Sequence, residues 1–444
     1  MSQATPCTEI PVYDLVGVGF GPSNLALAIA VTEHNGQTGD APVTALFLER
    51  QPSFGWHRGM LLADATMQVS FLKDLVTLRN PTSEYSYLCY LRDRDRLIDF
   101  VNHKSFFPLR VEFHDYLEWA AAKVPDMVRY AHEVDQVVPV LRDGVVAAFD
   151  VRVRHAGGVS TYRARNLVVA TGLRPRIPAG VDACDRIWHS RDLLTNIGRL
   201  DGADPARFVV VGAGQSAAEV TAFLHDRFPR AEVCGVFSRY GYSPADDSSF
   251  ANRIFDPAAV DDYYGAPPEI KKMLMNYHSN TNYAVVDHDL IDELYRRAYR
   301  EKVAGVQRLR LLNVSRLAAA KETEDGRVEV TIETLTTGEL STITADVLIC
   351  ATGYQPVDPF PLLGEAARHY RRDEFGRAVV ERDYRIAADP SVTAGVYLQG
   401  GTEHSHGITA SLLSNAAVRS GDIVRSIAAR LRAGRPLAVA ANAG

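Results

Sequence analysis

Two glycine-rich segments carry residue types that could bind nucleotide phosphates, and the first lies near the N-terminus. Gly19-x-Gly21-Pro22-x-Asn24 follows an apolar run and precedes a helical pattern. The first glycine of such a segment permits a tight turn, and the second lets backbone approach a pyrophosphate at the positive end of the helix. Asn24 stands where a third glycine usually lies, and Glu49 ends the next predicted strand, where an acid can bind ribose hydroxyls. The segment therefore predicts a dinucleotide site.

The second segment, Gly212-x-Gly214-x-x-Ala217, has the same context, but the strand that follows it ends in Ser238 and Arg239 instead of an acid. An acid would repel a 2′-phosphate, whereas serine and arginine would accept one, so this site favours NADPH over NADH. The alternative is that Arg239 is an ordinary surface cation. A nucleophile elbow around Ser216 explains fewer residues, because the second glycine of that motif is missing.

The cysteines and histidines limit the redox chemistry. The five cysteines form no C-x-x-C pair, which argues against a disulfide framework, a thiolate zinc site and a dithiol electron acceptor. These cysteines are Cys7, Cys89, Cys184, Cys234 and Cys350. Two dinucleotide sites suggest electron transfer from NADPH to a flavin, and O2 is the remaining acceptor. His404-x-His406 would face one way on a strand, but with no clear third ligand we expect no metal.

The elements that must position these residues repeat along the chain. Apolar strands over 12–18 and 208–211 run into the glycine turns, and later strands each end in Ala-Thr-Gly, at 170–172 and 351–353. This repetition predicts an α/β protein with two Rossmann-like dinucleotide-binding domains. Four further segments are predicted to be a linker, two insertions that build a substrate site and an amphipathic helix. In that order they are Leu193–Pro205, Phe71–Trp119, Tyr242–Val303 and Ser420–Leu437.

Length and composition exclude several classes of protein. The chain has 444 residues, of which 46% are hydrophobic and 23% charged, the balance of an ordinary globular protein with two or three domains. A net charge of −6 offers no electrostatic footprint for nucleic acid or anionic lipid. The first residues resemble no secretory signal, and no apolar run is long enough to span a bilayer, so we expect a cytoplasmic protein without a membrane partner.

A larger set of motifs resembles one enzyme family over nearly the whole chain. The motifs are Gly19-x-Gly21-Pro22-x-Asn24-Leu25, Phe54-x-Trp56-His57-x-Gly59-Met60, Met67-Gln68-x-x-Phe71-Leu72-Lys73-Asp74-Leu75, Asp346-x-x-Ile349-x-Ala351-Thr352-Gly353-Tyr354 and His406-Gly407-x-x-x-x-Leu412-Leu413-Ser414. Together they are similar to the flavin-dependent N-hydroxylating monooxygenases, the L-ornithine N5- and L-lysine N6-hydroxylases of siderophore and hydroxamate biosynthesis. Asn80-Pro-Thr-Ser83 and Phe107-Pro-x-Arg110-x-Glu112-Phe113-x-Asp115-Tyr116 favour the ornithine branch, although Cys89 stands where many members have asparagine.

The resemblance implies roles for individual residues. Lys73, Asn252, Asn282 and Ser414 would bind the substrate, with Asn282 also counted as catalytic. FAD would be bound by Gly19, Phe20, Gly21, Pro22, Ser23, Asn24, Leu25, Glu49, Trp56, His57, Gln68, Val134, Leu412 and Leu413. NADPH would be bound by Gly212, Ala213, Gly214, Gln215, Ser216 and Arg239. Taken singly, each of these residues has an ordinary alternative, such as an asparagine that caps a turn.

The resemblance also implies the reaction. NADPH reduces FAD, O2 adds at the flavin C4a to give a hydroperoxide, and the amine attacks its distal oxygen. The amine must be neutral, yet a reference pKa of about 10.4 leaves only about 10^-3.4 of it neutral at pH 7, a cost of roughly 4.6 kcal/mol. A desolvated site without a nearby carboxylate lowers that cost, so asparagines suit the amine pocket better than acids.

The predicted architecture resembles glutathione reductase, with an FAD-binding domain over 1–195 and 351–444 that is interrupted by an NADPH-binding domain over 196–350. Substrate-site segments are expected at about 57–119 and 242–303. L-Ornithine and O2 are the expected substrates, and the chain is expected to form a homo-oligomer, either a dimer or a tetramer. Alternatives are an L-lysine or diamine hydroxylase, an NADPH:flavin reductase or oxidase, and a non-catalytic redox sensor. A single methylene separates ornithine from lysine, which a simple pocket distinguishes only about 10–200-fold.

Overall fold

The computed structural model describes residues 10–37 and 42–434 and contains two five-stranded parallel sheets, one in each half of the molecule. The first sheet has the order β19-β8-β2-β3-β4, and the second the order β10-β17-β11-β12-β13. The first comprises Gly395–Leu398, Asn166–Val169, Leu15–Val18, Ala45–Leu48 and Val128–Arg129. The second comprises Ile187–His189, Val347–Cys350, Arg207–Val211, Glu232–Val236 and Leu309–Leu312. In each parallel sheet one strand runs into a glycine turn that is followed by a helix. This arrangement confirms the predicted α/β class.

Helices cover both sheets and give each half its own core. In the first half, α1 (Pro22–Gln37) and α12 (Ala416–Gly434) pack against each other. In the second half, α6 (Gln215–Arg227) and α9 (His288–Val303) pack against each other and against the sheet. The core of the second half also contains Met60, Leu62 and Ala65, so a segment of the first half is buried inside the second.

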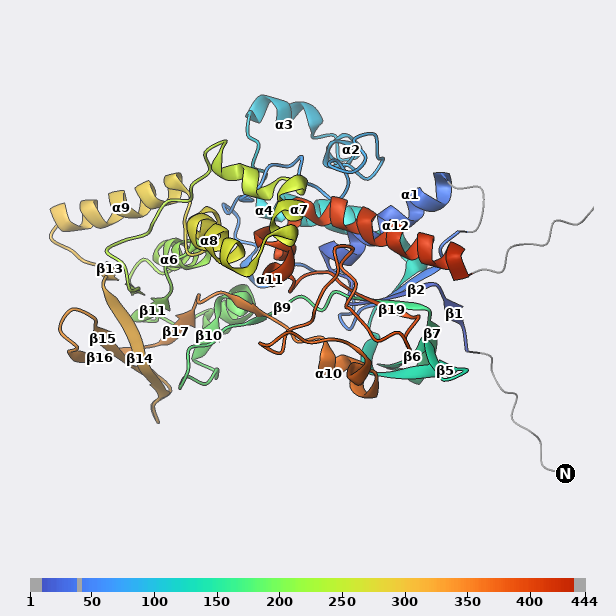
Figure 1. Cartoon of the computed structure of the whole chain (residues 1–444). Coiled ribbons are helices and arrows are strands. Elements are labelled where there is room, and N and C mark those ends of the chain that lie inside the picture. The colour runs from blue at the N-terminus through green and yellow to red at the C-terminus, as the bar shows by residue number, and fades with distance from the viewer. Residues whose placement is uncertain (1–9, 38–41, 435–444) are drawn as a thin grey trace, which may run out of the picture.

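Two smaller sheets, one of them mixed because β1 and β7 pair in parallel and the other antiparallel, lie at opposite ends of the molecule (Figure 1). One has the order β1-β7-β6-β5, and the other the order β14-β15-β16. Their strands are Val12–Tyr13, Gly158–Ala164, Val145–His155 and Glu133–Arg142 at one end, and Ser315–Glu322, Val328–Thr334 and Leu340–Ala345 at the other. A short ribbon of β9 (Leu173–Pro175) and β18 (Tyr354–Pro356) joins the two halves, because the chain crosses between them twice and the crossings pair.

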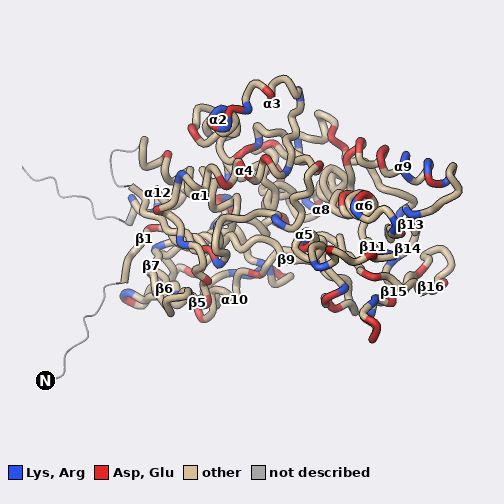
Figure 2. Tube along the Cα trace, turned by 180° about the vertical axis from the view of Figure 1, so that it is seen from behind, with Lys and Arg blue, Asp and Glu red and all other residues tan. Residues whose placement is uncertain are grey.

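The two predicted insertions are mainly helical. The first contains α2, α3 and α4, and the second contains the 3₁₀ helix η5 and the helices α7 and α8 before α9. The first three span Tyr87–Asp93, Leu97–His103 and Arg110–Ala121, and the second set spans Ala251–Phe255, Pro257–Gly265 and Pro268–His278. Lys, Arg, Asp and Glu are interspersed along the trace, and α9 carries both signs (Figure 2).

Four sequence predictions about single elements need correction. The strand expected over 12–18 is two strands in two sheets, because Asp14 turns its carboxylate to the amide and hydroxyl of Thr44. The expected linker at 193–205 begins with a helix, α5 (Leu193–Ile197), whose Leu193 is buried. The C-terminal helix begins at Ala416 instead of Ser420, and residues 435–437 of the prediction lie outside the described residues. His404 and His406 lie on a helix, α11 (Glu403–His406), and not on a strand.

The second sheet also reaches further back in the sequence than residue 196, where we placed the start of the NADPH-binding domain. Strand β10, which precedes that position, pairs with β17 in the second sheet. Within the part of the chain that the structure describes, no helix combines the length and apolar character needed to cross a bilayer.

Candidate functional site

The first glycine turn is shaped by close backbone packing. Gly19 has φ +85°, and a Cβ there would lie 2.5 Å from the carbonyl oxygen of Ala170. Asn24, buried on α1, donates from Nδ2 to the Gly19 carbonyl at 2.7 Å. A Cβ at Gly21 would meet nothing within 4 Å. The turn is therefore tight on its sheet side and open where a pyrophosphate would approach the start of α1.

Glu49 lies against this turn. Its Oε2 accepts a hydrogen bond from the Phe20 amide at 2.7 Å, and its Oε1 accepts one from the Gln51 amide at 2.8 Å. The side chain is buried at the end of β3, beside the turn. Each carboxylate oxygen can accept more than one hydrogen bond, so Glu49 keeps capacity for ribose hydroxyls.

The second glycine turn repeats the first. Gly212 has φ +141°, and a Cβ there would lie 2.3 Å from the carbonyl oxygen of Ala351. Ala170 and Ala351 each begin an Ala-Thr-Gly segment, so each fingerprint packs its first glycine against an equivalent strand end. This shared packing explains why the two motifs recur together in the sequence.

A group of buried polar atoms near the first turn has no protein partner. Such atoms usually find partners, and leaving one unpaired costs about 1–3 kcal/mol. The atoms are Thr402 Oγ1, Ser411 Oγ, Ser414 Oγ, both amide atoms of Asn415, and Asn24 Oδ1. Leu412 and Leu413, which we predicted to contact FAD, lie among them in the chain. Unpaired donors and acceptors of this kind fit a large polar cofactor at this position.

A buried guanidinium that the sequence analysis missed reaches the same turn. Arg419 on α12 donates to Gln399 Oε1 at 2.6 Å, to the Ala410 carbonyl at 2.7 Å and to Ser23 Oγ at 3.3 Å. Burial lowers the pKa of Arg419, and the side chain forms no salt bridge with any described residue. Its charge therefore adds to the positive end of α1, where an anion is favoured. Its place on an amphipathic helix gave no signal of this contact in the sequence.

Arg239 lies beside the second turn and is exposed. It donates to the Ala284 carbonyl at 2.8 Å and to Ser243 Oγ at 3.2 Å, and it pairs with no described carboxylate. A Cβ added at Gly214 would lie 3.2 Å from the Cα of Ala284, so Arg239 is anchored to the residue that contacts the turn. This arrangement leaves the guanidinium charge free for a phosphate.

Two glutamines that we predicted to contact different cofactors share one acceptor. Gln215 Nε2 donates to Asp287 Oδ2 at 2.5 Å and to Glu219 Oε1 at 3.1 Å, while its Oε1 accepts from the Asp287 amide at 2.9 Å. Gln68 Nε2 lies 3.4 Å from the same Asp287 oxygen. Asp287 also caps α9, since its Oδ1 accepts from the Leu290 amide. The sequence analysis missed Asp287, although an aspartate just before a helix is a recognisable cap.

The predicted substrate residues Lys73 and Asn252 come from different insertions and meet at η5. The Lys73 ammonium lies 5.2 Å from the centre of the Phe255 ring, at the end of the 3₁₀ helix that carries Asn252. Burial lowers the pKa of Lys73, while the charge of Asp256 raises it in part. Asn252 Nδ2 donates to the Asp247 carbonyl at 2.6 Å, so its amide also caps a turn.

Asn282 and Ser414 approach the same region from two other segments. The amide of Asp246 donates to the Asn280 carbonyl, which ties the Asn282 turn to the loop before η5. Helix η5 also contacts η8 (Ile408–Ser411), which ends three positions before Ser414. The structure thus gathers all four segments, while no hydrogen bond joins Lys73, Asn252, Asn282 and Ser414 directly within the described residues.

The remaining predicted residues lie nearby. His57 has φ 51°, and desolvation by the surrounding atoms, with the charges of Arg110 and Arg191, lowers its pKa to about 4 although part of the residue is exposed to solvent. The ring centroids of His57 and Trp56 are 4.7 Å apart. Val134 is the second residue of β5, Ala213 lies within the second turn, and Ser216 is the second residue of α6.

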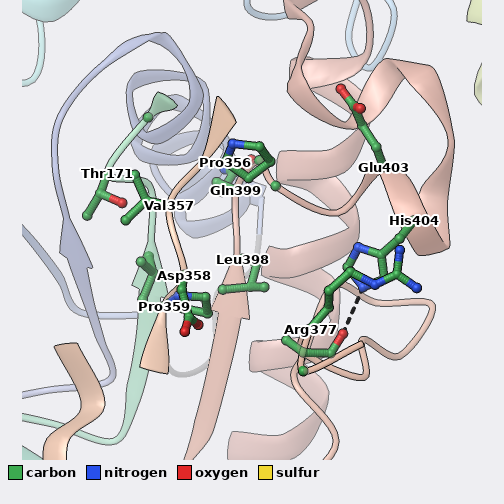
Figure 3. A pocket seen from close by; sticks show the side chains of 16 residues that line it. Thr171, Pro356, Val357, Asp358, Pro359, Arg377, Leu398, Gln399, Glu403 and His404 are labelled. Carbon is green, nitrogen blue, oxygen red and sulfur yellow. Dashed lines mark hydrogen bonds between the residues drawn. The ribbon is translucent and has the colours of Figure 1, made fainter. Parts of the chain in front are cut away.

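A hollow of about 400 Å³ lies where β8 and β19 end, and Figure 3 shows Thr171, Gln399, Glu403 and His404 around it. None of the residues that we predicted to bind substrate, FAD or NADPH lines this hollow. It adjoins the site through Glu403, whose Oε1 accepts a hydrogen bond from Tyr283 at 2.6 Å, one residue after Asn282.

Metal ligands do not gather anywhere in residues 10–37 and 42–434. His404 and His406 each bond a backbone carbonyl through Nε2, of Ala378 and Arg382 respectively. Cys7 lies outside the described residues, and the four other cysteines form no disulfide.

Comparisons with known proteins agree with this geometry. The family model described as L-lysine 6-monooxygenase/L-ornithine 5-monooxygenase matches residues 11–356. An L-ornithine N(5)-monooxygenase of Burkholderia cepacia is 45% identical over 404 residues, which cover 89% of this chain and 90% of that protein. The solved ornithine N-hydroxylase of Kutzneria sp. 744, with reduced FAD, NADP+ and L-ornithine, is 48% identical with a TM-score of 0.91 and covers 95% of this chain and 100% of that one. The L-lysine 6-monooxygenase of Pseudomonas syringae is 30% identical with a TM-score of 0.83 and covers 94% and 100% of the two chains.

Proposed function

The chain belongs to the L-lysine 6-monooxygenase/L-ornithine 5-monooxygenase family, and we propose that it hydroxylates the side-chain amine of L-ornithine with FAD, NADPH and O2. In this reaction one oxygen atom of O2 enters the amine and the other leaves as water, while NADPH becomes NADP+. The product, N5-hydroxy-L-ornithine, is a precursor for hydroxamates of the siderophore type. Greater identity to ornithine enzymes than to the lysine enzyme supports ornithine as the substrate.

The environment of the Lys73 ammonium is the main support for this proposal. Its ammonium is half-buried, forms no salt bridge with any described residue and lies at the wall that also holds Asn252. An ammonium that has only an aromatic ring and the more distant charge of Asp256 beside it, in a partly closed site, is suited to the α-carboxylate of an amino acid. A reductase or oxidase of the same fold would have no use for it.

The cofactors fit the residues present. The open first turn, Glu49 and the unpaired atoms around Ser414 and Asn415 would hold FAD, and the second turn with Arg239 would hold NADPH. When bound, FAD accepts a hydride from NADPH and activates O2. The protein then has to orient the amine, exclude water and keep the amine neutral.

The amine end of the site suits a neutral nucleophile. The predicted contacts there, Asn252, Asn282 and Ser414, carry no charge, so none of them stabilises an ammonium ion. A carboxylate at one of these positions would raise the pKa of the bound amine and slow its attack. We therefore assign these residues to the amine side of ornithine and Lys73 to its carboxylate side.

The test is to follow hydroxylamine formation and NADPH oxidation together, with ornithine, lysine and putrescine. We expect hydroxylamine in step with NADPH consumption for ornithine and much weaker coupling for the other two amines. Tight coupling with lysine or putrescine instead would move the assignment to the alternative substrates. NADPH consumption that yields only peroxide with all three would overturn the hydroxylase assignment.

We also propose that the enzyme is a cytoplasmic homo-oligomer. Exposed apolar side chains on and after α3, namely Ile98, Val101, Phe106 and Phe107, support an association surface. The requirement for NADPH supports the cytoplasm. Light scattering coupled to gel filtration tests the homo-oligomer, and a monomer mass would contradict it. Cell fractionation tests the cytoplasmic location.

A further inference from the structure

A buried ion pair connects the two halves of the molecule at the base of the second glycine turn. Arg110, the first residue of α4, donates from its two terminal nitrogens to both carboxylate oxygens of Glu219 on α6, at 2.7 and 2.9 Å. Their side chains are 11% and 6% exposed. A two-pronged arginine–carboxylate contact fixes orientation as well as distance. Helix α6 is therefore held at a set angle to α4.

Arg110 is also anchored to the segment of the first half that is buried in the core of the second half. Its guanidinium also donates to the carbonyls of Met60 at 3.0 Å and Thr66 at 3.3 Å, and its amide donates to the Ala65 carbonyl. Gln68, two residues beyond Thr66, reaches Asp287 in the other half. The segment around residues 60–68 thus contacts α6 and the start of α9 together.

Gln215 completes the connection and uses its side-chain donors in doing so. Both hydrogens of its amide nitrogen are directed to protein acceptors, Glu219 and Asp287, and its oxygen accepts from the Asp287 amide. An amide nitrogen has only two hydrogens to donate. A direct bond from this nitrogen to NADPH would therefore require one of the two contacts to break.

We propose that Arg110, Glu219, Gln215 and Asp287 form a positioning network that aligns the NADPH-binding turn with the flavin half. Gln215 then acts through Glu219 and Asp287 and does not bind NADPH itself, in contrast to the role that the resemblance implied. The inference rests on the proposed function, because it takes the turn at 212–214 as the NADPH site. The step that needs the alignment moves a hydride, one proton with two electrons, from NADPH to FAD, which leaves NADP+ and reduced flavin.

The test separates binding of the dinucleotide from its alignment. Glu219→Gln removes the charge and one acceptor, and Gln215→Met removes the link from the turn. For both variants we expect flavin reduction at saturating NADPH, followed by stopped flow without oxygen, to slow by about 10–100-fold, since a misplacement of about 1 Å costs on the order of 100-fold. The Kd of NADP+, measured by calorimetry, should change by less than about threefold, because Arg239 and the turn remain.

The matched control is Asp226→Asn on the same helix. Asp226 pairs with Arg297 at 2.6 Å but is exposed and lies away from the first half, so both measurements should stay at the wild-type values. The double variant Glu219→Gln/Gln215→Met should be no slower than the worse single variant, because both act through one network. If Glu219→Gln does not fold, Arg110→Lys keeps the charge and loses the two-pronged contact, and it should also slow reduction.

Several outcomes would overturn the network. If Gln215→Met and the folded ion-pair variants, Glu219→Gln or Arg110→Lys, reduced the flavin at the wild-type rate, the ion pair would stabilise the fold without aligning NADPH. A weaker Kd for NADP+ in Gln215→Met, with an unchanged rate at saturation, would make Gln215 a direct ligand. If wild-type enzyme were not reduced by NADPH at all, the proposed function itself would fail, which is a distinct result.

Discussion

The ammonium of Lys73 lies 5.2 Å from the centre of the Phe255 ring, so the residue assigned to the substrate carboxylate rests over an aromatic face. Such a contact contributes about 0.5–2 kcal/mol, whereas a charge-assisted bond to a carboxylate contributes about 1.5–3 kcal/mol. The ring therefore orients the free lysine without competing strongly with an arriving amino acid. It also ties the position of Lys73 to the helix that carries Asn252.

Replacing Lys73 by alanine should raise the KM for ornithine by about 10–150-fold, because one charge-assisted contact is lost. Flavin reduction by NADPH should persist, since other segments build the cofactor sites. Putrescine, which lacks the carboxylate, should be turned over equally by both enzymes. Lys123→Ala is the control, because Lys123 also lies over an aromatic ring, that of Trp119, but it follows the end of α4. Normal ornithine kinetics in Lys73→Ala would remove the main support for an amino-acid substrate.

Asp74 should matter for ornithine binding through the loop that holds Lys73. Its carboxylate accepts four hydrogen bonds, from the amides of Val76, Thr77 and Tyr87 and from the Thr77 hydroxyl. Asp74→Asn replaces one acceptor oxygen by a donor, so we expect the free energy of unfolding to fall by about 1–3 kcal/mol. The KM for ornithine should rise roughly tenfold on the same scale of lost contacts.

A double-mutant cycle checks this role of Asp74. In the Lys73→Ala background, Asp74→Asn should have no further effect on the KM for ornithine, because the loop then has no ammonium to position. An equal rise in KM in both backgrounds would show that Asp74 acts on the pocket independently of Lys73.

Arg239→Ala should raise the KM for NADPH by about 10–150-fold and leave the KM for NADH nearly unchanged, since only NADPH carries the 2′-phosphate. Steady-state kinetics with both dinucleotides measures the difference. Arg316→Ala provides the comparison, because Arg316 is an exposed arginine of the same half that is already paired with Glu333. Equal losses for the two dinucleotides would assign Arg239 to another task.

Acid should destabilise the fold through His406. Burial lowers the pKa of His406 to about 4, and the ring stacks on Tyr384 with centroids 4.2 Å apart. The unfolded chain binds this proton near pH 6.5, so the stabilisation is present above pH 6.5 and is lost as the pH falls towards 4. We expect His406 to account for about 2 kcal/mol of stability lost between pH 8 and pH 5.

Urea unfolding of His406→Gln at the two pH values tests that contribution. The variant should be less stable at pH 8 but should lose about 2 kcal/mol less than wild type on acidification. His288→Gln, at an exposed position on α9, should retain the full pH dependence. An unchanged pH dependence in His406→Gln would assign the acid sensitivity to other groups.

Sequence patterns predicted the elements whose structure depends on residues close together in the sequence. The strand–glycine–helix units at residues 15–37 and 207–227 are continuous in sequence, so their apolar runs and turn glycines predicted them well. Asp14 splits an otherwise apolar run, and its hydrogen-bond partner Thr44 lies 30 positions away, directly before β3. His404 and His406 have the spacing of a strand but lie on a short helix, since their ring nitrogens find carbonyls at residues 378 and 382.

The contacts that assemble the site are long-range, and one sequence does not reveal them. Arg110 and Glu219 are 109 positions apart, and Ser23 and Arg419 are 396 apart. Each of these residues alone is typical of a helix surface. Their burial depends on how the two halves pack, so family resemblance supplied most of the site residues, while the network around Asp287 emerged only from the fold.

Because β8 pairs with β19, the order of synthesis constrains how the first half can fold. Asn166 pairs with Gly395, and the whole second half emerges from the ribosome between these two strands. At about 5–20 residues per second, one edge of β8 waits roughly 10–45 s for its partner. An apolar strand with an open edge is prone to pair with other chains during such an interval. The nascent chain is therefore most exposed to misassembly while its inserted half is being translated.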